Sequence, residues 1–365
     1  MKKTLKTYSI ILMVFLLPVH LYAQTAAGAP RILTLDETFN VLYSLDNRRG
    51  EFRWDPFFQE GSFAIGGHYG IFSTSLQPGQ NGFLMINNRD IYPVPLPFIN
   101  NGELVFPEPF VNTAREAFQR SISENSSFYR IAAIIIDPGH GGRDTGAARE
   151  QVINGRRQMV NEKDITLNAS KMLRDMLVRT YPDKRILMTR ERDITMSLEE
   201  RTLIANSVPI RRNEAIIYIS IHANAAHNTN ARGFEVWYLN PEHRRTVLDD
   251  THFPDFPELR QIMNMLTEEA FTAESIRIAQ SILDSLQDAM GGVMPSRGLK
   301  AEEFFVVRRS HMPAVLVELG FVSNVEDVTL MTNDADLRRM VHAVYKGIVD
   351  FVSAFERSGG FIAAR

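Results

Sequence analysis

Two histidines and two glutamates occupy positions at which a chain can assemble an enzyme site. His140 lies in the glycine-rich segment 137–146, which follows an apolar run, and His222 comes at the end of a second apolar run. Glu318 directly follows a third such run, and Glu162 precedes an amphipathic stretch. Two imidazoles and a carboxylate are an established ligand set for catalytic zinc, and a further carboxylate can act as a base. These residue types therefore predict a catalytic metal site.

Each of these residues also has a purely structural interpretation. A histidine after a strand is commonly a hydrogen-bonded core residue, Glu162 could cap a helix, and Glu318 could pair with an arginine such as Arg297. A buried carboxylate is costly unless it is paired or binds a metal, so the combination favours a metal site. His227 is close to His222 in the sequence and provides a mutational control.

Alternating strands and helices are expected to position these side chains. Strands are predicted over five apolar runs: residues 131–136, 185–189, 215–219, 234–238 and 314–317. Helices are predicted over four amphipathic stretches: residues 165–179, 198–207, 274–290 and 336–355. Such alternation indicates an α/β domain with a mostly parallel sheet flanked by helices. In these sheets, sites form at the carboxyl ends of the strands, where the four residues lie.

The composition excludes several classes of protein. The chain has 365 residues, of which 44% are hydrophobic and 23% charged, as in folded proteins of two or three domains. Its formal net charge of -3 is too near zero for a nucleic-acid-binding surface, so we expect no nucleic acid partner. There is no cysteine, which excludes disulfides, thiol nucleophiles and thiolate zinc sites. Any metal must be held by His, Asp or Glu.

Residues 1–23 have the three-part pattern of a signal peptide: a basic start, a short apolar core and a small residue at the cut. Pro18 and His20 interrupt the apolar run, so a retained membrane anchor is the less favoured alternative. We expect export to the periplasm or cell envelope, with no transmembrane anchor after cleavage. The segment contains three lysines and no acidic residue, so the remaining chain has a net charge of -6.

Residues 30–120 are expected to form a small β-rich ancillary domain that precedes the α/β domain. Short alternating runs such as 62–65 and 82–86 are bounded by Gly, Asn and Pro, and a helix is expected at 110–118. The proline-rich run 93–97 suits only an edge strand or a spacer. Trp54, Phe57 and Phe58 could form an exposed aromatic surface, although core packing is the favoured interpretation.

A polar linker over 121–129 and a catalytic domain over 130–357 complete the expected organisation. Residues 131–355 resemble the catalytic domain of zinc-dependent N-acetylmuramoyl-L-alanine amidases, which cleave peptidoglycan in cell-wall remodelling and daughter-cell separation. The matching segments are 136–142, 162–164, 187–190, 201 with 205–206, 220–225, 232–236 and 313–324. The ancillary domain resembles, on shorter motifs, the copper amine oxidase N-terminal-like stalk domain.

The amidase resemblance implies a role for each of the four residues. It assigns zinc to His140, Glu162 and His222, and the catalytic carboxylate to Glu318. The implied reaction is hydrolysis of the amide between N-acetylmuramic acid and the L-alanine of peptidoglycan. Two alternatives remain: a zinc carboxypeptidase-type hydrolase of wall peptides, and a non-catalytic wall-binding regulator.

Residues 241–272 form a longer connection than is usual between a strand and a helix. Apolar residues recur at helical spacing in its second half: Leu259, Ile262, Met263, Leu266 and Ala270. Some members of the family carry a regulatory insertion here that covers the site until a protein activator removes it. By that resemblance, an acidic residue such as Glu258, Glu268 or Glu269 is expected to act as a temporary zinc ligand. The alternative is an amphipathic helix that packs on the domain.

Overall fold

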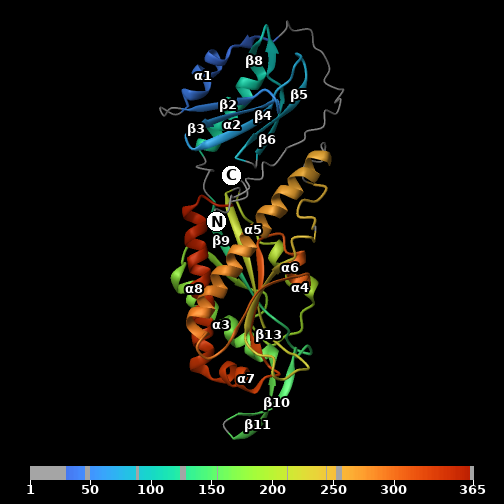
Figure 1. Ribbon diagram of the computed structural model, residues 1–365, viewed down its shortest axis with the longest axis vertical. Coiled ribbons are helices and arrows are strands. Elements are labelled where there is room, and N and C mark those ends of the chain that lie inside the picture. The colour runs from blue at the N-terminus through green and yellow to red at the C-terminus, as the bar shows by residue number, and fades with distance from the viewer. Residues whose placement is uncertain are drawn as a thin grey trace, which may run out of the picture. The chain divides into compact units, whose positions relative to one another are not determined.

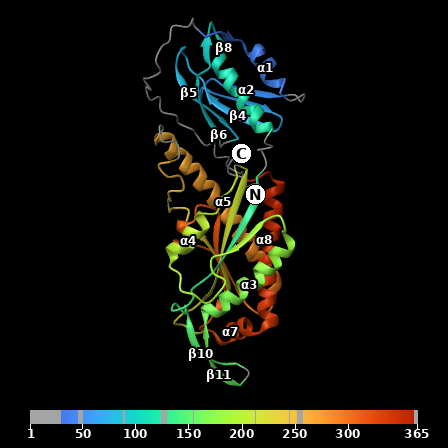
Figure 2. The ribbon, with the colours of Figure 1, turned by 180° about the vertical axis from the view of Figure 1, so that it is seen from behind.

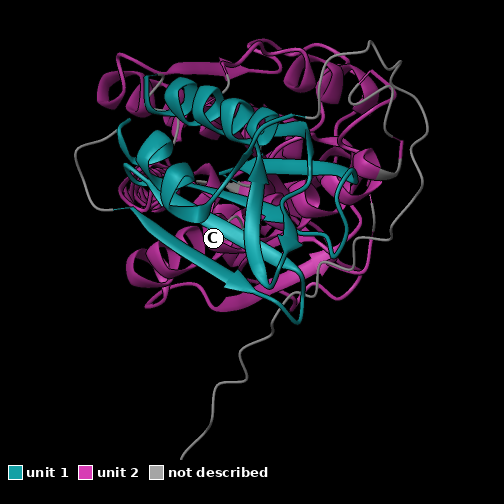
Figure 3. Cartoon of the chain, turned by 90° about the horizontal axis from the view of Figure 1, so that it is seen from above, with its two compact units in different colours: residues 1–124 teal, residues 125–365 magenta. Residues whose placement is uncertain are grey.

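The computed structural model describes residues 30–45, 50–87, 90–123, 129–153, 155–211, 213–243, 245–251 and 257–361 (Figures 1 and 2). The chain divides into two compact units, residues 1–124 and 125–365, which Figure 3 distinguishes by colour. The boundary between the units falls within the expected linker. The expected signal peptide lies outside the described residues. Within the described parts, no helix has the length and apolar character needed to cross a membrane.

Unit 1 is β-rich, with a five-stranded antiparallel sheet in the order β2-β3-β4-β5-β6 and a three-stranded sheet in the order β1-β8-β7. Its strands are β1 (Ile32–Leu33), β2 (Glu51–Asp55), β3 (Glu60–Ile65), β4 (His68–Ser73), β5 (Asn81–Ile86), β6 (Asp90–Pro95), β7 (Phe98–Asn100) and β8 (Glu103–Pro107). Its helices are α1 (Leu35–Tyr43) and α2 (Glu108–Ser123). The proline-bearing strand β6 lies at the edge of its sheet, as expected.

The aromatic residues of unit 1 divide between core and surface. Phe63, Phe72 and Phe106 are buried and their rings contact one another. Phe57 and Phe58 instead lie in the turn between β2 and β3, with 85% and 57% of their surface exposed. The preference for core packing of this pair is therefore wrong. Asp55 fixes the turn by accepting hydrogen bonds from the amides of Phe57 and Phe58, which directs both rings away from the sheet.

Unit 2 contains a six-stranded sheet in the order β12-β9-β13-β16-β14-β15. Its strands are β9 (Arg130–Pro138), β12 (Arg185–Met188), β13 (Glu214–Asn224), β14 (Phe234–Leu239), β15 (Ser296–Glu302) and β16 (Ala314–Phe321). All neighbouring strands are parallel except β14 and β16. The mostly parallel α/β sheet is therefore confirmed, with one antiparallel pairing that the sequence patterns did not predict.

Helices cover both faces of this sheet. They are α3 (Glu162–Thr180), α4 (Leu198–Asn206), α5 (Pro257–Met290), α6 (Phe305–Arg309), α7 (Val325–Thr332) and α8 (Asp334–Arg357). Ile134 and Ile136 of β9 belong to the apolar cluster formed with α3, α5 and α8. The alternate residues Ala133 and Ile135 belong to the cluster formed with α4 and α6. Burial on both faces explains why the central strands are continuous apolar runs.

Several elements differ from the sequence-based expectation, and strand β15 and the short helices α6 and α7 were not predicted. A hairpin of β10 (Ala148–Ile153) and β11 (Arg156–Asn161) lies between β9 and α3, where no strand was predicted. Helix α5 begins at Pro257, not at residue 274, and so runs through the second half of the expected insertion. Proline is favoured at the first position of a helix, and neither Gly nor Pro interrupts the sequence from there to Met290.

Candidate metal centre

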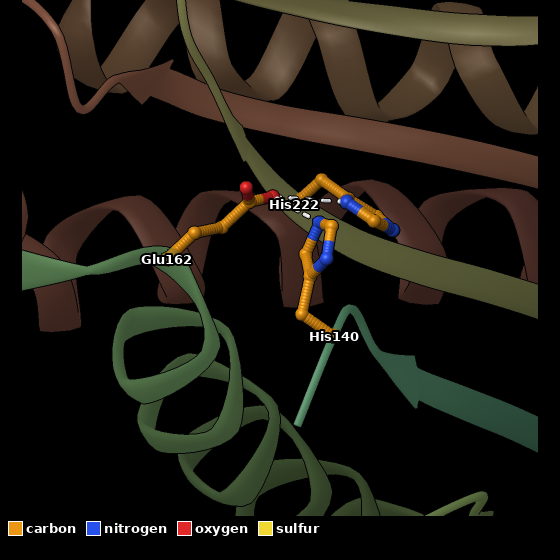
Figure 4. A group of neighbouring side chains, drawn as sticks. All are labelled: His140, Glu162 and His222. Atoms are coloured by element: carbon orange, nitrogen blue, oxygen red, sulfur yellow. Dashed lines mark hydrogen bonds and ion pairs between the residues drawn. The ribbon is translucent and has the colours of Figure 1, made fainter. Parts of the chain in front are cut away.

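Three of the four predicted side chains meet at the carboxyl edge of the sheet (Figure 4). Glu162 is the first residue of α3, His222 lies near the end of β13, and His140 follows β9. Glu162 Oε1 lies 3.1 Å from His140 Nε2 and 3.0 Å from His222 Nδ1. One ligand atom from each residue falls within a group no more than 4.8 Å across. These three residues could hold a metal ion.

The glycine-rich segment permits this convergence. His140 has φ of 60°, a conformation that a residue with a side chain seldom adopts. A Cβ atom at Gly139 would collide with the His222 ring, and one at Gly146 would lie 2.5 Å from Glu162 Oε2. The glycines therefore let the main chain approach His222 and Glu162 closely.

Glu162 is buried, with 5% of its surface exposed, and the main chain holds both of its oxygens. The amide of Ala223 donates to Oε1 at 3.0 Å, and the amide of Ala147 donates to Oε2 at 2.9 Å. Burial alone would raise the pKa of Glu162, but hydrogen bonds and charges from His140 and His222 outweigh it and hold the pKa well below its usual range. The carboxylate is thus ionised and fixed. Its partners exclude the helix-capping interpretation.

His140 is oriented by a second carboxylate on its far side. Its Nδ1 lies 2.9 Å from Asp144 Oδ2, and Asp144 Oδ1 accepts a hydrogen bond from the amide of Gly146. Burial lowers the pKa of His140, but Glu162 and Asp144 raise it above its usual value. A carboxylate behind a ligating imidazole fixes its ring and tautomer, which is how many metal-binding histidines are held. No role for Asp144 was predicted, although it lies in the quoted glycine-rich segment.

Two buried arginines hold the main chain that presents His140. Arg190 donates from Nε to the Pro138 carbonyl at 3.0 Å and from Nη2 to the Gly139 carbonyl at 2.8 Å. Arg201 donates to the Pro138 and His140 carbonyls and pairs with Asp137 at 2.7 Å. Both arginines lie in motifs that supported the family resemblance, but no local pattern assigns them this role.

Glu318 lies beside the three convergent residues but is not hydrogen-bonded like Glu162. Its Cα is paired with that of His222 on β13, its side chain is buried, and Oε2 has no hydrogen-bond partner among the described residues. Burial and the neighbouring Glu162 and Glu235 raise the pKa of Glu318 well above its usual value, against a smaller lowering by Lys300. The structure thus leaves a carboxylate oxygen free to exchange a proton.

Arg297 does not pair with Glu318, so that structural alternative is wrong. Arg297 Nε donates instead to Oε2 of Glu235 at 2.7 Å, and Lys300 Nζ lies 2.7 Å from the same oxygen. The other Glu235 oxygen accepts from Asn224 Nδ2 at 2.7 Å and Trp237 Nε1 at 3.2 Å. Glu235 is therefore saturated with partners. No role was predicted for Glu235, although it lies in the quoted segment 232–236 and is a carboxylate within an otherwise apolar strand.

The segment 241–272, which was expected to supply a temporary metal ligand, lies away from the candidate metal site. Strand β14 is antiparallel to β16, so the chain leaves β14 at the amino edge of the sheet and α5 returns from that edge. The hydroxyl of Ser275 on α5 accepts from the amide of Ala314, the first residue of β16, and Glu268 lies further still from the carboxyl edge. In both views the first half of α5 extends away from the end that carries β10, β11 and α7 (Figures 1 and 2).

Glu268 is buried at that distant end and accepts a hydrogen bond from the amide of Arg245 at 3.0 Å. Glu269 is exposed, and the side chain of Glu258 lies outside the described residues. The prediction of Glu268 as a temporary metal ligand is therefore wrong. The helical pattern itself was correct, and Met263 and Ala270 are buried as the packing alternative requires.

Comparisons of the sequence and the structure with known proteins all match amidases. A family model described as N-acetylmuramoyl-L-alanine amidase matches residues 134–350. The N-acetylmuramoyl-L-alanine amidase CwlM of Bacillus licheniformis is 32% identical over 60% of this chain and 68% of its own length. The probable cell wall amidase LytH of Staphylococcus aureus is 28% identical over 60% of this chain and 58% of its own. The solved amidase AmiC2 of Nostoc punctiforme has 25% identity and a TM-score of 0.45, covering 60% of this chain and 97% of that one.

Proposed function

The chain belongs to the N-acetylmuramoyl-L-alanine amidase family, and on this basis we propose that it hydrolyses the peptidoglycan amide between N-acetylmuramic acid and L-alanine with a bound zinc ion. The observation that supports this proposal most directly is that a possible metal site and a carboxylate able to transfer a proton lie at the same edge of the sheet. Three metal-ligand side chains converge there, and the Glu318 carboxylate beside them has an oxygen without a described partner. A metal-dependent amidase needs both groups.

The three side chains fit zinc by their chemistry. His140 and His222 provide imidazole nitrogens and Glu162 a carboxylate oxygen, the set found in catalytic zinc sites that keep an open position. Two amide donors hold Glu162, and Asp144 holds His140, so the donor atoms need little rearrangement. Bound zinc acts as a Lewis acid that polarises a carbonyl and makes water more acidic.

Glu318 performs the proton transfers in this proposal. It accepts a proton from the attacking water and delivers it to the amide nitrogen, which then leaves as the amine of L-alanine. A carboxyl group with a raised pKa is suited to give back the proton that it accepts. Arg190 and Arg201 contribute by holding the carbonyls next to His140, so that the ligand stays in place during the reaction.

We propose that the enzyme works in the cell envelope after export, because its substrate is there and residues 1–23 have the pattern of a signal peptide. The staphylococcal relative is named a probable cell wall amidase. A role in daughter-cell separation and a stalk-like role for residues 30–120 stay predictions. A protein activator that acts on residues 241–272 is also a prediction, and it would have to act from the amino edge of the sheet.

Product analysis tests this function. Purified peptidoglycan is digested with the full chain, with and without a zinc chelator, and the soluble products are identified by mass spectrometry. We expect intact stem peptides with a free amino-terminal L-alanine, and we expect the chelator to abolish them. A carboxypeptidase-type hydrolase would release single carboxyl-terminal amino acids, and a non-catalytic regulator would release nothing. Either of these results, or cleavage that the chelator leaves unchanged, contradicts the proposal.

A further inference from the structure

A row of charged side chains crosses the sheet at its carboxyl edge. His222 on β13, Glu318 on β16 and Glu235 on β14 are successive Cα partners. Paired residues of adjacent strands point to the same face of a sheet. The row continues to β15, where Arg297 and Lys300 contact Glu235. The charged surface therefore extends beyond the proposed catalytic carboxylate, in the direction away from the metal ligands.

The cations at the end of this row exceed the charge available to neutralise them. Arg297 and Lys300 share one oxygen of Glu235, at 2.7 Å each. Glu235 itself is 1% exposed, whereas the side chains of Arg297 and Lys300 are 35% and 29% exposed. These three groups together carry a formal charge of +1, and the two cations are the groups that reach solvent. A buried anchor with partly exposed cations is suited to bind an anion.

The guanidinium of Arg297 is held in one orientation. Its Nε bond to Glu235 fixes one edge, and its guanidinium carbon lies over the Phe321 ring, 4.9 Å from the ring centre. Its Nη atoms make no hydrogen bond to the described part of the chain. Two parallel N–H donors in a fixed fork match the geometry of a carboxylate. Lys300 lies over the Trp237 ring and supplies a second, more flexible cation.

We infer that Arg297 and Lys300 bind a free carboxylate on the second residue of the stem peptide. This inference rests on the proposed amidase function. Glu318 delivers its proton to the leaving nitrogen, so the peptide side of the substrate lies near Glu318. Strands are about 4.8 Å apart, which puts β15 roughly 10 Å from Glu318. An extended peptide advances about 3.3–3.6 Å per residue, so a carboxylate on the second residue lies roughly 7 Å from the scissile nitrogen. The Arg297 side chain shortens the remaining distance, because it reaches from β15 to Glu235 on β14.

Two matched substrates test this subsite. They are N-acetylmuramoyl-L-alanyl-D-glutamate with a free α-carboxylate, and its isoglutamine counterpart, in which that group is an amide. We expect the zinc-loaded wild-type chain to prefer the acid by about tenfold in kcat/KM, a typical effect of a charge-assisted bidentate contact. In Arg297→Gln the ratio should approach one, and Arg297→Lys should retain part of the preference. A purely structural defect would lower both rates and leave their ratio unchanged.

Arg277→Gln is the matched control. Arg277 also pairs with a buried carboxylate, that of Glu274, and lies over a phenyl ring, but on α5 away from the row. It should keep the wild-type ratio. A wild-type ratio near one, or a ratio that Arg297→Gln leaves unchanged, would overturn the subsite.

Binding of the product peptides separates this inference from the amidase proposal. L-Alanyl-D-glutamate and L-alanyl-D-isoglutamine are titrated into wild-type and Arg297→Gln protein by calorimetry, which requires no turnover. About tenfold tighter binding of the acidic dipeptide, lost in Arg297→Gln, supports the subsite even if neither muropeptide is cleaved. Equal affinities of wild type for both dipeptides contradict it even if the amidase activity is confirmed.

Discussion

Glu318 and Glu235 are Cα partners on adjacent strands, yet their carboxylates have opposite environments. Glu235 accepts hydrogen bonds at both oxygens and is neutralised by two cations, whereas Oε2 of Glu318 has no partner among the described residues. Both are buried. The different surroundings suit the two carboxylates to different roles. Glu235 is suited to be a fixed anchor and Glu318 to carry a proton.

Removing either imidazole ligand should abolish zinc binding. His140→Ala and His222→Ala each leave two protein ligands, which are too few for a stable catalytic site. Metal content after dialysis, measured by mass spectrometry, should fall from about one zinc per chain to near zero. His227→Ala is the control. His227 is exposed, so this variant should retain the metal. Retention of zinc by His140→Ala or His222→Ala would refute the ligand assignment.

Asp144 should strengthen zinc binding without being a ligand. Asp144→Asn removes the charge behind His140 Nδ1 and should weaken zinc affinity by about 10–100-fold, as for other carboxylates behind ligating histidines. Competition with a fluorescent chelator measures the affinity. Asp175→Asn, on the exposed side of α3, is the control and should have wild-type affinity. Equal affinities for Asp144→Asn and wild type would exclude this role.

Asp137 should make the fold sensitive to acid. Burial alone would raise the pKa of Asp137, but the Arg201 charge and hydrogen bonds from Thr189 and Arg201 hold it below its usual range. A carboxyl whose pKa is lowered on folding stabilises the fold above its unfolded pKa of about 3.9, and this stabilisation is lost as the pH falls through the folded value. Its contribution is thus complete near neutral pH.

Asp137→Asn should therefore lower the free energy of unfolding by about 3–5 kcal/mol at pH 7, because Arg201 stays buried without its partner. The difference from wild type should shrink below about pH 4 as the wild-type carboxyl is protonated. Urea unfolding of chelator-treated proteins from pH 7 to pH 3 measures this. Asp183→Asn, at an exposed site, should have little effect at any pH. A difference that does not change with pH would count against the Asp137–Arg201 pair.

Glu268 should support the fold and have no inhibitory role. Glu268→Gln weakens the contact with buried Arg245. Burial lowers the pKa of Arg245 to about 10, and the charge of Glu268 opposes that lowering. We expect a loss of about 1–3 kcal/mol in the free energy of unfolding and no gain in amidase activity. Thermal unfolding measures this loss, and Glu269→Gln, at an exposed neighbouring position, is the control. An increase in activity on Glu268→Gln would restore the inhibitory interpretation.

The position of the candidate site could be predicted from local sequence because three of its four side chains follow buried parallel strands. His140, His222 and Glu318 each come at the end of an apolar run, and the carboxyl ends of parallel strands form one edge. Which side chains orient those ligands could not be predicted. The contacts of Asp137 with Arg201 and of Glu235 with Arg297 join residues more than 60 positions apart, and no local pattern specifies such pairs.

The same limit explains the errors in the fold. The hairpin β10–β11 is largely exposed, so its strands lack the apolar run by which buried strands are recognised. The direction of β14 depends on where its neighbours lie, not on its own residues. The helical pattern in the second half of residues 241–272 fits either a cover over the site or an extension of α5. Only the antiparallel pairing of β14 places that segment at the amino edge.

Replacement of Glu318 tests the central claim most directly. Glu318→Gln and wild type are compared for zinc content and for turnover of a defined muropeptide at equal enzyme concentration. We predict that Glu318→Gln retains about one zinc per chain, while kcat falls by about 10²–10⁴-fold, because the ligands remain and the proton carrier is lost. Full hydrolysis by Glu318→Gln with zinc bound would contradict the account.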